Sequence, residues 1–137
     1  MNIRSIVALA TVLGTGAAST PVVAHHSFAA EFDSQRTLTV TGTVQKLEWT
    51  NPHARLYVDA RDEKGNIVHW DFELGPPNGL MRRGWNRNSL KQGHVVTVQG
   101  FHSKTQPFIA NARSVKLPDG RDVFAGSSFD VDNTTGK

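Results

Sequence analysis

The chain has 137 residues, with 15 lysines and arginines, 12 aspartates and glutamates, six histidines and no cysteine. This length favours one domain, and 38% hydrophobic with 20% charged residues is the composition of a folded globular protein. The absence of cysteine excludes a disulfide scaffold, a thiolate metal site and a cysteine nucleophile. A net charge of +3, without a concentrated basic stripe, argues against a nucleic-acid-binding protein.

The N-terminal segment has the features of a secretory signal peptide. Arg4 is its only charge, an apolar run follows at residues 6–13, and small residues stand before two candidate cleavage sites, after Ala18 and after Ala24. The apolar run is shorter than the roughly 20 residues that span a bilayer. We favour cleavage after Ala24, which predicts a mature protein that is periplasmic or extracellular and has no membrane span.

Removal of residues 1–24 leaves a domain at 25–125 with an N-terminal arm, followed by a flexible tail at 126–137. The tail is expected to be flexible because it is rich in serine, asparagine, threonine and glycine.

The first half of the domain alternates apolar and polar residues in three stretches, at 37–49, 54–60 and 67–74. This period of two predicts strands, and the turn residues at 62–66 predict a hairpin between the second and third. In the first stretch the apolar phase shifts after Val44. A β-bulge near Gln45 and Lys46 would cause this shift in a long, bent strand.

In the second half, the prolines at 76 and 77 end the third predicted strand. Residues 78–90 follow and predict one or two short helical turns. Further strands are predicted at 93–100 and 108–117, with a loop at 102–107 and a short run at 121–124. This element order predicts an all-β protein with one short helix, an OB-fold-like five-stranded Greek-key barrel. An antiparallel sandwich is the alternative, but it explains neither the helix nor the bent strand.

Ligands of OB-folds usually bind the face of strands two and three and the loops that join strands one to two and four to five. The first of these loops contains Asn51 and His53 and follows Trp49, and the second begins at His102. If the fold is right, His53 and His102 approach the same rim. The predicted ligand-binding residues are Trp49, Asn51, His69, Asp71 and Glu73, the last three of which alternate on one face of a strand. The alternative is that this face is simply solvated.

Cleavage after Ala24 would make His25 the N-terminal residue. A free α-amine has a pKa near about 7.7–8.0, so a metal ion can displace its proton near neutral pH. The amine and the imidazole of His25 can then chelate one ion, with a third nitrogen from His26, His53 or His102. Nitrogen ligands in a tetragonal arrangement favour Cu(II), which makes copper the expected cofactor. The alternative is that His25 and His26 are a polar stub.

Two function classes follow from these residues. The first is an exported metal-binding protein that acts in metal carriage or sensing. The second is a non-catalytic binding or assembly module for a small molecule, a glycan or a protein partner. An enzyme is less favoured because neither a nucleophile elbow nor a glycine-rich phosphate loop is present. A hydrolase that uses His53 with Asp71 or Glu73 is the weakest alternative.

Four motifs resemble a family of small exported bacterial proteins of unknown function: AHHSFAAEFD at 24–33, WTNPHA at 49–54, WDFE at 70–73 and RGW at 83–85. The resemblance covers nearly all of the mature chain, and its two histidine-containing motifs are the most specific. It implies an exported OB-like domain and brings no established activity. One position departs from the family pattern, since Gly93-His94 stands where Gly-Asp is expected.

Overall fold

The computed structural model of the protein describes residues 28–126. The predicted signal peptide, His25, His26 and the tail from residue 127 lie outside them. In chain order the elements are α1 (Phe28–Glu31), β1 (Phe32–Glu48), β2 (Arg55–Arg61), β3 (Ile67–Glu73), α2 (Pro77–Met81), β4 (Val95–Ser103), β5 (Ile109–Lys116) and β6 (Asp122–Phe124).

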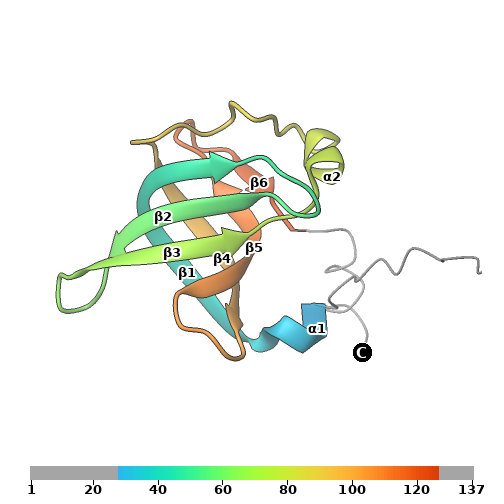
Figure 1. Ribbon diagram of the computed structural model, residues 1–137. Helices are drawn as coiled ribbons and strands as arrows, with labels where there is room; N and C mark the ends of the chain where they lie inside the picture. The colour runs from blue at the N-terminus through green and yellow to red at the C-terminus, as the bar shows by residue number, and fades with distance from the viewer. Residues whose placement is uncertain (1–27, 127–137) are drawn as a thin grey trace, which may run out of the picture.

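Five strands form a closed ring of hydrogen bonds in the order β1, β2, β3, β5, β4 and back to β1 (Figure 1). Neighbouring strands are antiparallel except β3 and β5, which are parallel. The predicted all-β, OB-like class is therefore confirmed, with a barrel-like ring and a short helix, α2, between β3 and β4. The run at 121–124 adds a sixth strand, β6, on β5, and α1 adds a single helical turn that the sequence did not indicate.

The bulge predicted in the first strand is present. Val44 of β1 pairs with Val58 of β2, but the next pair is Lys46 with Tyr57, so Gln45 is the extra residue. The bulge turns the following apolar residues back toward the interior. Just before it, Gly42 lies so close to β2 that an added Cβ would collide with the carbonyl oxygen of Asp59.

The β2–β3 hairpin has a fixed register. Its turn places Gly65 at φ 84°, and an Asp62 carboxylate oxygen accepts hydrogen bonds from the backbone N–H groups of Lys64 and Asn66. A hydrogen bond from the Asn66 side chain, together with these backbone hydrogen bonds, holds the pKa of Asp62 below its usual value. Consequently Arg61 pairs with Ile67, and every later pair of the hairpin follows from that register.

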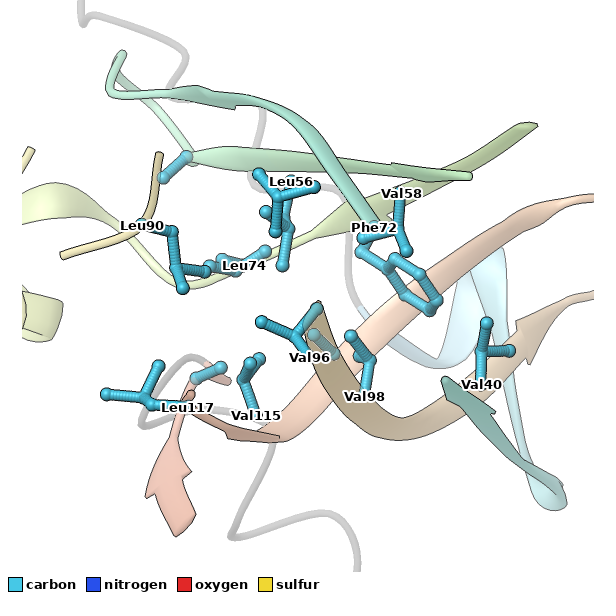
Figure 2. Packing of buried hydrophobic residues seen from close by; sticks show 14 of the residues in the cluster. Val40, Leu56, Val58, Phe72, Leu74, Leu90, Val96, Val98, Val115 and Leu117 are labelled. Atoms are coloured by element: carbon cyan, nitrogen blue, oxygen red, sulfur yellow. The ribbon is translucent and has the colours of Figure 1, made fainter. Parts of the chain in front are cut away.

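Aliphatic and aromatic side chains from every strand of the ring fill the interior (Figure 2). The alternating stretch at 67–74 places the apolar residues Val68, Trp70, Phe72 and Leu74 on the inner face. Phe72 and Leu74 are fully buried, whereas Val68 and Trp70 are only partly buried. The largest completely buried side chains are Phe72, Leu56, Leu74, Leu80, Val44, Val58, Val96, Val98 and Val115.

A second, smaller cluster lies outside the ring, where Phe28 of α1 and Phe32 pack on Phe101 of β4. The rings of Phe28 and Phe101 meet edge to face at a centroid distance of 5.4 Å. This contact fixes the start of the described chain against the outer face of β4. Within residues 28–126, neither helix has the length or apolar composition needed to cross a bilayer.

Candidate functional site

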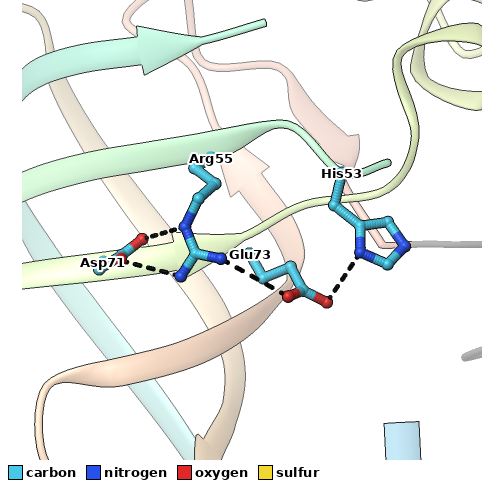
Figure 3. A network of polar contacts seen from close by, with 4 residues as sticks. All are labelled: His53, Arg55, Asp71 and Glu73. Atoms are coloured by element: carbon cyan, nitrogen blue, oxygen red, sulfur yellow. Dashed lines mark hydrogen bonds and ion pairs between the residues drawn. The ribbon is translucent and has the colours of Figure 1, made fainter. Parts of the chain in front are cut away.

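The outer face of β2 and β3 carries a connected network of polar side chains (Figure 3). Arg55 donates hydrogen bonds of 2.8 Å from Nε and Nη2 to the two carboxylate oxygens of Asp71. Its Nη1 lies 3.7 Å from Oε2 of Glu73, and the other oxygen, Oε1, lies 3.3 Å from Nδ1 of His53. One arginine and one histidine thus hold two neighbouring carboxylates.

The hairpin register explains why these groups meet. Arg55 lies directly opposite Glu73, and Tyr57 lies opposite Asp71, so Arg55 reaches Asp71 on the diagonal. The side chains of Arg55, Asp71 and Glu73 are 30%, 27% and 17% exposed. Partial burial makes each ion pair less screened by water than a surface pair. The hydrogen bonds that Arg55 donates to Asp71 raise the pKa of Arg55 despite its burial, so the guanidinium stays charged.

His53 lies two residues before the start of β2, in a loop whose Asn51–Pro52 peptide bond is cis. The residue after it, Ala54, is fully buried and exchanges backbone hydrogen bonds with Leu74 and Gly75. These hydrogen bonds fix the backbone next to His53. Figure 3 shows Nδ1 of the ring directed at Glu73 and Nε2 directed away from it. A carboxylate behind one ring nitrogen is the usual partner of a histidine that binds metal through the other.

A second pair of the same kind lies at the hairpin end of this face. His69 Nδ1 lies 2.6 Å from Oδ1 of Asp59, which is its cross-strand partner. The His69 side chain is 80% exposed, however, and no arginine holds Asp59 as Arg55 holds Asp71 and Glu73 in the described structure. The face that the sequence grouped as His69, Asp71 and Glu73 therefore divides into two separate clusters.

His102 lies elsewhere. The structure places it in β4 rather than in the loop expected at 102–107, because β4 continues to Ser103. Its ring lies 5.9 Å from that of Trp70, and its pKa is lowered by burial and, to a smaller extent, by the charge of Arg36. Trp70 and Glu73 project to opposite faces of β3 because side chains alternate along a strand. His53 and His102 consequently lie on opposite sides of the sheet.

The two other candidates are in or next to the first loop. Trp49 is partly buried and packs against the core, whereas Asn51 is exposed. Within residues 28–126, no three histidine, aspartate or glutamate side chains gather in an arrangement that could hold a metal ion. His25 and His26 lie outside those residues, so among the predicted metal ligands that the structure describes, His53 is the one paired with a carboxylate.

Arg55 is the member of the network that the sequence analysis missed. A signal for it was present in the turn at 62–66, which sets the pairing of the two strands. Counting back from that turn places Arg55 opposite Glu73 and diagonal to Asp71. This register places the positively charged Arg55 beside the negatively charged Asp71 and Glu73.

Comparison with protein families gives one match, the family of unknown function DUF6152, over residues 14–108. The chain belongs to the DUF6152 family. The match includes His25 and His26, the loop of His53, and β4 with His102. No curated protein and no solved structure matches the chain.

In this DUF6152 protein a buried amide lies next to the polar network. Asn111 of β5 pairs with Glu73 of β3 on one side and with Phe101 of β4 on the other. It is only 3% exposed, and its Oδ1 has no hydrogen-bond partner among the residues that the structure describes. A row of adjacent positions thus runs from Phe28, which packs on Phe101, through Asn111 to Glu73 and His53.

Proposed function

We propose that this protein is an exported metal-binding protein that acts in metal carriage or sensing. It binds Cu(II) through the α-amine and imidazole of His25 together with His53, with His26 as a further candidate ligand. The observation that carries the proposal is the His53–Glu73 pair, 3.3 Å apart on the outer face of the sheet. His102 is not part of this site, because its contacts lie on the other face of β3.

The N-terminal arm has the right length to reach His53. Phe28 packs on Phe101, and Phe101, Asn111 and Glu73 occupy adjacent positions on three neighbouring strands. With strands about 4.8 Å apart, Phe28 and Glu73 are separated by about two strand spacings, or about 10 Å. Three extended residues span about the same distance. A chain cleaved after Ala24 therefore begins within reach of His53.

The chemistry of the donors favours copper. Nδ1 of His53 lies 3.3 Å from Glu73, which leaves Nε2 as the available ligand, and Arg55 holds Glu73 in place. An amine and two or three imidazoles form a nitrogen-rich set of ligands. Among the divalent ions, such a set favours Cu(II). The unpaired Oδ1 of Asn111 lies beside the same path, where an N–H group of the arm would satisfy it.

The test uses the exported protein, after mass spectrometry has shown that it begins at His25. We expect Cu(II) to give a type-2 EPR spectrum with nitrogen splitting, and the spectrum to change in His25→Ala and in a protein with one extra residue before His25. His53→Ala should weaken binding, whereas His69→Ala, which removes the other carboxylate-paired histidine of this face, should not. Unchanged affinity in His25→Ala and His53→Ala would refute the site.

A second candidate function, the non-catalytic binding module, is favoured by a separate observation. A cavity of about 500 Å³ opens between the first half of β1 and the β2–β3 hairpin, on the other face of β3 from His53. Cavities of this size are typical of binding sites. Binding there does not require the N-terminal arm or a metal ion.

A further inference from the structure

The cavity is a groove between two strands that diverge. Its wall includes five consecutive residues of β1, Thr37–Thr41, and four consecutive residues at the end of β2 and in the turn, Ala60–Glu63. Side chains of a strand alternate between faces, so a wall made of consecutive residues is a strand edge rather than a sheet face. The groove is therefore bounded by backbone.

The edge of β1 in this groove is unpaired. Thr37 to Thr41 pair with β4 on one side, but pairing with β2 on the other side begins only at Thr43. Among residues 28–126, no other strand pairs with β1. A row of N–H and C=O groups thus faces the groove, and the segment from Thr37 to Gln45 contains no charged residue that would discourage strand pairing.

Aromatic side chains form a pocket at one end of the same groove. The ring of Phe108 meets that of Trp70 edge to face at a centroid distance of 5.5 Å, and the ring of His102 lies 5.9 Å from that of Trp70. Phe108 is 47% exposed and has φ 58°, a left-handed conformation that bulky residues rarely adopt. Its carbonyl accepts a hydrogen bond of 2.9 Å from the N–H of Asp71, which holds this conformation. Strain of this kind is concentrated at functional positions.

We propose that the groove binds an extended segment of a partner protein, which adds to the free edge of β1 as a strand and places one aromatic or large aliphatic side chain against Trp70 and Phe108. Strand addition obtains affinity from main-chain hydrogen bonds and specificity from side-chain pockets, and this groove offers both. A small molecule could use the pocket alone but not the five-residue edge. The inference specifies the second candidate function and does not depend on metal binding.

The geometry also favours a single strand over a second copy of this protein. The β2–β3 hairpin forms the opposite wall of the groove, with Arg61, Asp62 and Glu63 at its tip. If a second copy paired its own β1 edge with this one, its β2–β3 hairpin would come along with that edge. The two hairpins would then occupy the same space. A lone extended segment has no such obstacle.

The experiment selects binders from a displayed library of random peptides on the metal-free protein. Binding of the selected peptides is then measured by fluorescence polarisation against three variants. Thr39→Lys places a charge on the free edge of β1. Gln99→Lys places the same charge on the cross-strand partner of Thr39, in a strand that is paired on both sides. Phe108→Gly removes the pocket's exposed ring at a φ that glycine adopts freely.

We expect peptides with a central aromatic or large aliphatic residue, and an affinity loss of at least about tenfold in Thr39→Lys and in Phe108→Gly but not in Gln99→Lys. Their binding should shift the amide NMR signals of Thr37–Thr41. Peptides that bind all variants equally, or the recovery of none, would overturn the proposal. It would also fail if N-acetylphenylalaninamide bound as tightly as the peptides, or if Thr39→Lys converted a dimer of this protein to a monomer. None of these outcomes bears on copper binding.

Discussion

Arg55 donates two hydrogen bonds of 2.8 Å to the two carboxylate oxygens of Asp71, its diagonal neighbour on the next strand. The planar guanidinium matches the carboxylate, so the arginine is held in one orientation. Its remaining nitrogen then faces Glu73, which in turn contacts His53. The position of the histidine therefore depends on a chain of charged contacts that begins at Asp71.

Replacing Arg55 with alanine should lower the free energy of unfolding by about 1–2 kcal/mol, because two partly buried carboxylates would lose their common partner. Urea denaturation measures this change. Lys46→Ala is the matched control, since Lys46 forms a 2.8 Å ion pair with Glu48 on the open surface. We expect that control to show no measurable loss, and equal losses in the two variants would contradict the assignment.

Replacing Glu73 with glutamine should weaken Cu(II) binding by about 10–100-fold, the usual cost of losing the carboxylate behind a metal-binding histidine. A competition titration with a copper chelator measures the affinity. Asp59→Asn makes the same change behind His69 and should leave the affinity unchanged. If both substitutions had the same effect, Glu73 would have no special role in positioning His53.

Replacing Gly42 with alanine should destabilise the protein by about 1–3 kcal/mol, because the new methyl group would collide with the Asp59 carbonyl oxygen and the side chain of Val58. Gly79→Ala in α2 is the control. Its nearest neighbour would be Pro76 Cγ at 3.5 Å, an ordinary contact. Thermal unfolding of the two variants should separate them, with Gly79→Ala unchanged or slightly more stable.

The pKa of His102 lies below its usual value of 6.5, chiefly because burial disfavours the charged ring. As the pH falls, the unfolded chain takes up this proton before the folded protein does. The stability contributed by neutral His102 is therefore complete above about pH 6.5 and is lost as the pH falls through the folded pKa. An NMR titration of the His102 ring in the folded protein should give a midpoint below the usual histidine value of 6.5. His102→Gln should reduce the acid loss of stability, and a His102 midpoint at or above 6.5 would contradict the prediction.

The strand alternation in the sequence was sufficient to predict the ring of strands and the bulge at Gln45. Both depend on local patterns, because the alternation of apolar residues along a strand shows which of its faces is buried. The same alternation placed His69, Asp71 and Glu73 on one face. Alternation alone could not divide them into two clusters, because that division depends on Arg55 and Asp59 in the neighbouring strand and so requires the hairpin register as well.

The sequence by itself thus determined the class of fold and the hairpin, and it supplied the histidines proposed as metal ligands. The tertiary structure decided that two of them, His53 and His102, do not lie together. His53 and His102 are far apart in the sequence and lie on opposite faces of β3, and only the parallel pairing of β3 with β5 brings Asn111 beside Glu73. The free edge of β1 could likewise not be predicted from the sequence, because whether a strand edge is paired depends on where the neighbouring strands begin and end. Such contacts join residues distant along the chain, and local patterns carry no information about them.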